Sequence, residues 1–322
     1  MLYRVCGLTV SSDTALPELL PSPKAGQEVP VDVRVRLQGS SRSLPQPRTW
    51  VLSSSLDDGS PWASCAKTEG GYLFRFHGLA DFFVDALGQE VESLFEAEAS
   101  PATLRHLFLD QVLPLVLNLR GQDALHATSV LTSRGACAFI GPSGTGKSTL
   151  AGIFQLAGCH VLSDDCLVIK EESGHIMATP GYPGLRLLED TLEAFRHNGG
   201  SALPVADYTS KLRITAGGQG GEFLADQRPL IRIYNLVRSA EPNGDKADAV
   251  PSIEPMSCGD AFMTLVSSVF RLDLTDRAML VRQFHFLERV VSLVPVRRLN
   301  LPNALSFLPA VRDAVLADIE AG

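Results

Sequence analysis

The sequence has few cysteines and no arrangement of them that marks a metal or redox site. Its 322 residues include 6 cysteines, and no two of them form a C-x-x-C pair. Paired cysteines are typical of zinc sites and redox motifs, and a disulfide-stapled domain needs many cysteines in a short chain. We therefore expect no disulfide framework and no zinc site, and buried free thiols at nearly all of these positions: Cys6, Cys65, Cys137, Cys159, Cys166 and Cys258.

An excess of basic charge and long apolar runs are also missing. The 28 Lys and Arg residues are outnumbered by 36 Asp and Glu residues, which gives a formal net charge of −8. Nucleic acids and anionic membranes attract basic faces, so this balance argues against both as partners. No apolar run is long enough to span a membrane, and the first residues do not read as a signal peptide. We expect a cytoplasmic protein whose composition, 45% hydrophobic and 20% charged, suffices for two packed domains.

One short motif indicates a chemistry. Residues 141–148 read G-P-S-G-T-G-K-S, the G-x-x-x-x-G-K-S pattern of a phosphate-binding P-loop, or Walker A motif. The apolar run before it, Gly135 to Ile140, predicts a buried strand, and the apolar spacing from Leu150 predicts a helix that ends near Gly158. In that context backbone N–H groups and the helix dipole point at an anion. The expected nucleotide-binding residues are Gly141, Ser143, Gly144, Thr145, Gly146, Lys147, Ser148 and Thr149.

Two adjacent carboxylates follow at the end of the next predicted strand, His160 to Leu162. Asp164 and Asp165 should lie at the same sheet edge as the P-loop. Because like charges in one site repel, one carboxylate can ligate Mg²⁺ while the pKa of the other rises toward that of a useful proton acceptor. We expect Lys147 to reach the terminal phosphates of a nucleotide and Ser148, Asp164 and Asp165 to lie at the metal.

The segment after the acidic pair predicts the kind of sheet. Residues 166–178 read as strand, Glu-Glu-Ser-Gly turn and strand, which is a hairpin in place of the helix that a parallel doubly wound sheet needs. We expect an α/β (α+β) fold with a mixed sheet. The glycine-rich stretch Gly217 to Gly221 is a candidate mobile loop over the site.

These residues carry a resemblance to a known family. GPSGTGKST, LSDD and His126, fifteen residues before Gly141, together resemble the catalytic domain of HPr kinase/phosphorylase, which is related in fold to phosphoenolpyruvate carboxykinase. The resemblance is close over 125–169 and loose over the rest of the C-terminal half. It implies phosphoryl transfer from ATP to a serine hydroxyl, with Asp164 as general base and with Asp165 and Ser148 near Mg²⁺. An imidazole at His126 can orient one carboxylate and shift its pKa.

The chain departs from that family in one signature. Where the family has Glu-Ile-Arg-Gly-Leu-Gly, residues 181–186 read Gly-Tyr-Pro-Gly-Leu-Arg, so the glutamate and the first arginine are missing. The reverse, phosphorylase activity is therefore not implied. Developing phosphoryl charge needs cations around it, and Arg186 and Lys211 are the candidates, with Arg213 a further one.

A second, weaker resemblance bears on the acceptor. The Gly-Leu at 7–8 and the Leu-Pro-Glu-Leu at 16–19 are similar to the N-terminal half of HPr-kinase-like serine kinases that modify lasso-peptide precursors. We expect an ATP- and magnesium-dependent kinase that phosphorylates a hydroxyl, a serine of a small protein or peptide. The alternatives are a small-molecule hydroxyl kinase and a nucleotide-responsive binding protein without turnover. The choice among ATP, GTP and pyrophosphate stays open, as does the oligomeric state, a homo-oligomer included.

The pattern of predicted elements suggests how the chain is divided. Residues 1–99 are mostly β in character, with candidate strands at Leu2 to Val10, Val29 to Leu37, Tyr72 to His77 and Phe82 to Asp85. Ser100 and Pro101 begin a connecting helix over 100–121, which Pro114 should kink. The phosphotransfer domain is expected at 122–322, with C-terminal helices at about 259–270, 276–290 and 304–319.

Overall fold

The computed structural model describes residues 1–22, 29–38, 43–56, 58–95, 99–188, 201–215, 223–238, 251–302 and 304–321. They fall into two compact units. Unit 1 is formed by Met1–Ala124, Pro204–Lys211 and Phe270–Arg282, and unit 2 by Leu125–Leu203, Leu212–Val269 and Gln283–Gly322. The helical segment after residue 99 thus belongs to the same unit as the N-terminal strands. Residues 204–211 and 270–282 belong to that unit as well. The glycine-rich stretch 217–221 lies outside the described residues.

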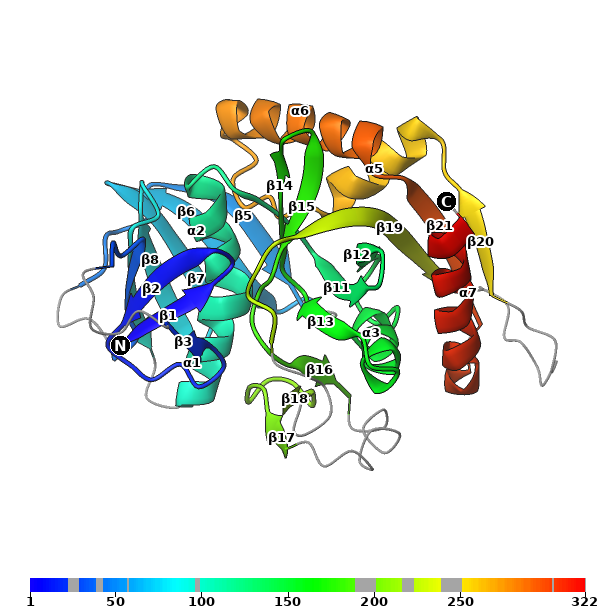
Figure 1. The fold of residues 1–322 in the computed structure, drawn as a ribbon. Coiled ribbons are helices and arrows are strands. Elements are labelled where there is room, and N and C mark those ends of the chain that lie inside the picture. The colour runs from blue at the N-terminus through cyan, green and yellow to red at the C-terminus, as the bar shows by residue number, and fades with distance from the viewer. Residues whose placement is uncertain are drawn as a thin grey trace. The chain divides into compact units, whose positions relative to one another are not determined.

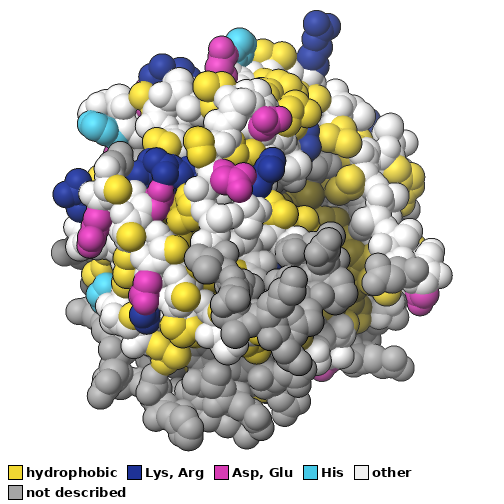
Figure 2. Space-filling view, turned by 90° about the vertical axis from the view of Figure 1, so that its right-hand side faces the viewer, with side chains coloured by type: hydrophobic (Ala, Val, Ile, Leu, Met, Phe, Trp, Pro, Cys, Tyr) yellow, Lys and Arg dark blue, Asp and Glu magenta, His cyan; other side chains and the backbone are white. Residues whose placement is uncertain are grey.

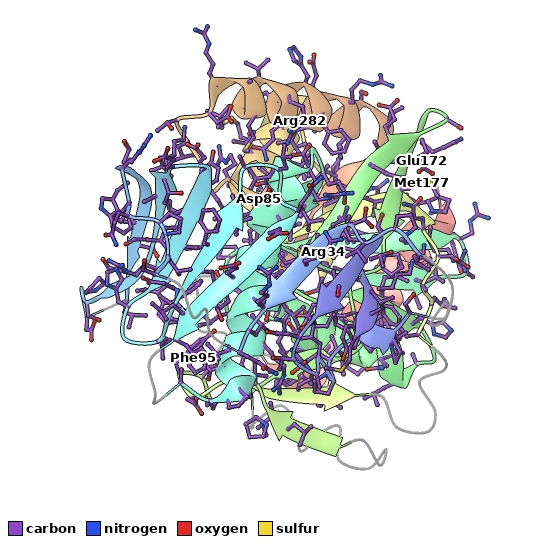
Figure 3. All side chains as sticks on the ribbon, turned by 90° about the vertical axis from the view of Figure 1, so that its left-hand side faces the viewer. Arg34, Asp85, Phe95, Glu172, Met177 and Arg282 are labelled. Carbon is purple, nitrogen blue, oxygen red and sulfur yellow. The ribbon has the colours of Figure 1, made fainter. Side chains whose placement is uncertain are left out.

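Unit 1 is built on an extended sheet (Figure 1). Its strand order is β3-β1-β2-β4-β9-β8-β7-β6-β5. Asp85 accepts hydrogen bonds from the N–H groups of Gln89 and Glu90 and so holds the turn from β8 to β9. Figure 3 labels this residue together with Arg34 on β4 and Phe95 at the end of β9. The strands are β1 (Leu2–Val5), β2 (Leu8–Ser12), β3 (Leu20–Pro21), β4 (Val33–Arg36), β5 (Thr49–Ser55), β6 (Pro61–Thr68), β7 (Gly71–Phe76), β8 (Ala80–Asp85) and β9 (Glu90–Phe95).

The expectation of one strand over Leu2 to Val10 was wrong. The chain turns back at Cys6 and Gly7, whose φ angles are 51° and 78°, so that β1 and β2 pair as a tight antiparallel hairpin. Two successive positive φ angles are what such a hairpin turn requires. Apolar alternation on both sides of the turn concealed this break in the strand.

The helical segment of unit 1 begins as the sequence predicts. Ser100 caps α1 (Pro101–Leu107) by accepting a hydrogen bond from the N–H of Thr103. The chain then widens into a π-helix, η1 (Phe108–Val112), before α2 (Leu113–Leu119). Pro114 has no N–H to donate to the preceding turn, and the π-helix lies directly before it, where the sequence predicted a kink.

Unit 2 contains a mixed sheet, as expected. Its strands run in the order β14-β15-β19-β12-β11-β13, and β21 pairs with both β19 and β20. β12 is parallel to β19 and antiparallel to β11, and β14 and β15 form the predicted hairpin. A separate small sheet has the order β16-β18-β17. The strands are β11 (Ala127–Thr132), β12 (Gly135–Ile140), β13 (His160–Ser163), β14 (Leu167–Glu172), β15 (His175–Thr179), β16 (Leu185–Leu187), β17 (Ser201–Pro204), β18 (Leu212–Thr215), β19 (Arg228–Arg238), β20 (Ser252–Pro255) and β21 (Val296–Leu301).

Helices cover both faces of that sheet. Ala136, Ala138 and Ile140 of β12 belong to a core shared with α5 (Cys258–Ser268) and the second half of α6 (Arg277–Leu293). Cys137 and Phe139 belong to another core, shared with α3 (Lys147–Leu156) and α7 (Leu308–Ala321). Because β12 is buried on both faces, its sequence is a continuous apolar run rather than an alternating one. This buried central strand fixes the position at which the loop after Ile140 begins.

On the face that carries α7, Lys and Arg side chains are interspersed with Asp and Glu in the described part of the chain (Figure 2). The six cysteines are free thiols. Among the described residues, we find no helix that is both long and apolar enough to cross a membrane.

Candidate functional site

The glycine loop, Gly141–Gly146, connects β12 to the N-terminus of α3. Gly146 is the residue before the helix and has φ 100°, a value that glycine adopts without strain. At Gly141 a Cβ atom would lie 3.0 Å from the carbonyl oxygen of Leu236. The loop therefore needs glycine at its first and last positions, and it leads directly into a helix N-terminus, where backbone N–H groups point outward along the axis.

Lys147 lies across this loop. Its Nζ donates to the carbonyl oxygens of Gly141 at 2.8 Å and Pro142 at 3.2 Å. Thr145 Oγ1 donates to the same Pro142 oxygen at 2.8 Å. The lysine is buried, whereas Ser143 and Gly144 at the tip of the loop are exposed. The buried ammonium thus lies against the loop's own carbonyl oxygens.

Asp164 is the most enclosed carboxylate of the site, with 4% of its surface exposed. Its Oδ1 accepts hydrogen bonds from Thr128 Oγ1 at 2.7 Å and from Ser148 Oγ at 2.8 Å. Its Oδ2 accepts from the backbone N–H of Arg186 at 3.0 Å. Burial and the neighbouring Asp165 raise the pKa of Asp164, and the Arg186 guanidinium and the hydrogen bonds from Thr128 and the Arg186 N–H oppose that rise. The carboxylate is fixed in place by groups from three separate segments.

Asp165 occupies a strained turn beside it. Its φ is 67°, in the left-handed region that non-glycine residues seldom adopt. The turn is closed by the Ser163 hydroxyl, which donates to the Cys166 carbonyl oxygen. Asp165 Oδ2 lies 3.3 Å from an Arg186 guanidinium nitrogen and Oδ1 lies 3.9 Å from His126 Nε2. With 20% of its side chain exposed, Asp165 is the more accessible member of the acidic pair.

His126 reaches the acidic pair from the start of β11. Its backbone N–H donates to the carbonyl oxygen of Ser268 at 2.7 Å, and Leu125 forms a β-bridge with Val269. The end of α5 therefore holds the histidine backbone, while the imidazole stays partly exposed next to Asp165. The structure thus brings His126 beside Asp165 rather than Asp164.

Arg186, on β16, is the cation that the structure places at the carboxylates. Only 3% of its surface is exposed. One guanidinium nitrogen donates to the backbone oxygen of Asp164 at 2.6 Å, and Nε lies 3.5 Å from Asp164 Oδ2. Lys211, the other cation expected there, belongs to unit 1, where its N–H donates to Thr209 Oγ1. The role expected for Lys211 stays a prediction.

Three residues near the site were missed by the sequence reasoning or given less weight there. Thr128 donates to Asp164, and the Nε of Arg238 donates to the carbonyl oxygen of Thr145 at 3.2 Å. Arg213, two residues after Lys211, is the register partner of Arg186 across β16 and β18. Only strand register brings these residues together, and the local motifs carry no signal for it.

The donor set suits a hard divalent cation bound together with phosphate. Among the described residues, no three His, Cys, Asp or Glu side chains gather in a way that could hold a metal ion by themselves. Mg²⁺ seldom needs such a cage, because one or two protein oxygens, water and substrate phosphates complete its shell. Ser148 Oγ and Asp164 Oδ1, 2.8 Å apart, and the adjacent Asp165 offer the oxygen ligands that Mg²⁺ prefers.

Comparisons with known proteins add little to this geometry. No family model and no curated protein matches the sequence. Among solved structures, the Hpr(Ser) kinase/phosphatase from Coxiella burnetii is similar with a TM-score of 0.31 and 14% sequence identity, over 61% of this chain and 97% of that chain. A TM-score this low leaves the function to be inferred from the residues of the chain itself.

Proposed function

We propose that this protein is an ATP- and magnesium-dependent kinase that transfers the γ-phosphate to a hydroxyl, a serine of a small protein or precursor peptide. The observation that carries the proposal is the 2.8 Å hydrogen bond from Ser148 to Asp164. It joins the hydroxyl of the G-K-S motif to the acidic pair. A nucleotide bound with its phosphates at the N-terminus of α3 would then have both carboxylates beside its terminal phosphate. The serine acceptor and the preference for ATP rest on the sequence resemblance.

The proposed reaction is an in-line displacement. The acceptor oxygen bonds to the γ-phosphorus while the bond from that phosphorus to the β–γ bridging oxygen breaks, and ADP leaves. The hydroxyl proton passes to a carboxylate of the acidic pair. Lys147 and Arg186 supply positive charge toward the phosphoryl oxygens. Bound Mg²⁺, for which Ser148 and the acidic pair are the proposed ligands, supplies further positive charge.

The two carboxylates can divide the work in two ways. The family resemblance assigns the proton to Asp164, and the direction of its pKa shift suits a proton acceptor. Access favours Asp165, because both oxygens of Asp164 already accept hydrogen bonds and Asp165 is the more exposed. In the second assignment Asp164 holds Ser148 and the Arg186 backbone, and His126 faces the acceptor carboxylate.

The test is transfer of labelled γ-phosphate from magnesium-ATP into an extract of the source organism. Native protein, Asp164→Asn and Asp165→Asn are compared, with ADP binding measured for each. Label in a peptide or protein band that depends on the native carboxylates supports the proposal and identifies the acceptor by mass. Full transfer by both variants would overturn the mechanism, and full transfer by one alone excludes that carboxylate as the base.

One alternative has a specific observation in its favour. The hydrogen bonds at both oxygens of Asp164 are what a purely structural carboxylate would make. A nucleotide-responsive binding protein without turnover would bind ATP and label nothing in the extract.

Label in small molecules alone would instead indicate a metabolite kinase.

A further inference from the structure

A stack of two arginines and a tyrosine lies beside the acidic pair. The guanidinium carbon of Arg186 lies 5.9 Å from the centre of the Tyr182 ring, and that of Arg213 lies 5.4 Å from it. All three residues are largely buried, with 3%, 8% and 6% of their surfaces exposed for Arg186, Arg213 and Tyr182. Both distances are within the roughly 6 Å over which an aromatic ring attracts a cation.

Strand pairing brings the two arginines together. Arg186 on β16 and Arg213 on β18 are direct register partners in the small antiparallel sheet (Figure 1). Side chains at such positions lie on the same face, and like charges placed opposite each other repel. Burial also lowers the pKa of Arg213 to about 10. A shared aromatic ring, whose faces are negative, offsets part of the cost of burying two guanidinium groups at paired positions.

The backbone makes room for this arrangement. Gly184 has φ 110°, and a Cβ there would lie 3.1 Å from Arg213 Cγ and 3.2 Å from Cδ. The stem of Arg213 therefore lies along the glycine at the turn before β16. A side chain at Gly184 would press on this stem and require it to shift.

We propose that Tyr182 is a positioning residue: its ring, shared by Arg213 and Arg186, keeps the Arg186 guanidinium on the acidic pair. The guanidinium is also held by the Asp164 backbone oxygen at 2.6 Å and lies 3.3 Å from Asp165. Ring and aspartates together restrict how it can turn. This proposal rests on the proposed phosphotransfer, in which Arg186 supplies charge to the phosphoryl group.

The kinetic test compares three side chains at residue 182. Tyr182→Phe keeps the ring, and we expect kcat within about threefold of native; Tyr182→Leu removes the ring, and we expect kcat to fall about 3- to 30-fold with ADP affinity unchanged. In an Arg186→Gln background, Tyr182→Leu should lower kcat no further, because the ring acts through that arginine. Equal losses in both backgrounds would overturn the proposal. Tyr234→Leu, which removes a ring that stacks on Phe139 in the same unit and a hydroxyl that donates to Asp318, reports how kcat responds to the loss of a buried tyrosine elsewhere in the core.

A second readout needs no turnover. The Nε–H resonance of Arg186, assigned by its loss in Arg186→Lys, should stay protected from solvent exchange in native protein and Tyr182→Phe and broaden in Tyr182→Leu. An unchanged resonance in Tyr182→Leu would overturn the positioning role. If the native protein transfers no phosphate, the proposed function fails, and this resonance still decides whether the stack holds the arginine.

Discussion

Ser148 and Asp164 are joined by a 2.8 Å hydrogen bond, although one lies in the first turn of α3 and the other follows β13. The serine donates its hydroxyl to the same carboxylate oxygen that Thr128 reaches from β11. These side-chain hydrogen bonds hold the helix N-terminus and the acidic pair at a fixed separation. That separation does not depend on the exposed tip of the loop. In the proposed function this distance determines where a phosphate can lie.

Replacing Lys147 by alanine should weaken ATP and ADP binding by about 10- to 100-fold, because charged hydrogen bonds to phosphate oxygens contribute about 1.5–3 kcal/mol. The side chain already spans the loop through the oxygens of Gly141 and Pro142. Calorimetric titration with ADP measures the change. The matched control is Lys170→Ala, which removes an exposed lysine on β14 and should leave affinity unchanged. Equal affinities for both variants would count against a phosphate role for the loop.

The local part of the site was accessible from the sequence. Strand β12, the glycine loop and α3 follow one another without interruption, and their spacing alone predicts the order strand, loop and helix. The same holds for β13 with the acidic pair and for the β14–β15 hairpin. Each of these rests on residues close together in the chain, where periodicity and turn chemistry are informative.

The places of Arg213 and Arg238 near the site could not be found in that way. Arg213 joins Arg186 through the register of β16 and β18, and Arg238 meets the glycine loop because β19 runs parallel beside β12. Nothing in the spacing of Lys211 and Arg213 indicates which of them belongs to unit 2. Register between distant strands depends on the packed sheet as a whole, so a choice between two cations two residues apart needs the structure.

Arg238→Gln should weaken nucleotide binding by about three- to tenfold. Its Nε holds the carbonyl oxygen of Thr145 at 3.2 Å, and one terminal nitrogen lies 3.1 Å from the position that a Cβ of Gly146 would take. The substitution removes a cation beside the loop and the hydrogen bond that holds Thr145. A three- to tenfold loss of affinity corresponds to about 0.6–1.4 kcal/mol. Arg298→Gln, at an exposed position on β21, is the control. The same dissociation constant in both variants would contradict this role.

Gly181→Ala should disturb the acidic pair without touching either carboxylate. A Cβ at this position would lie 2.7 Å from Ser163 Oγ, the hydroxyl that closes the turn carrying Asp164 and Asp165. Overpacking of this kind costs about 1–3 kcal/mol of unfolding free energy. Denaturant unfolding measures the loss.

The double variant Ser163→Ala with Gly181→Ala makes that prediction specific. Deleting the hydroxyl removes the atom that the new methyl would meet, so the double variant should be more stable than the sum of the two single changes predicts. Strict additivity would show that the contact is relieved by some other movement of the chain.

Stability at low pH should depend on Asp273 in unit 1. Its carboxylate is buried and lies 2.9 Å from Lys67 Nζ and 2.8 Å from the Tyr72 hydroxyl. Burial alone would raise the pKa of Asp273, but hydrogen bonds from Thr275, Lys67 and Tyr72 hold it below its ordinary value. A carboxylate with a lowered folded-state pKa contributes stability above its unfolded pKa, near 3.9, and loses it as the pH falls through the folded pKa.

Asp273→Ala should therefore cost about 3 kcal/mol of unfolding free energy at pH 7, since it leaves Lys67 and Tyr72 without their shared acceptor, and less as the pH is lowered toward 2. Urea unfolding of the full chain at both pH values measures the difference. Glu69→Ala is the control, because Glu69 pairs with Arg48 in solvent and such exposed pairs contribute little at any pH. A loss for Asp273→Ala that stays the same between pH 7 and pH 2 would mean that the residue acts through packing, because removal of an ionised carboxylate must lose its effect once the native carboxyl is protonated.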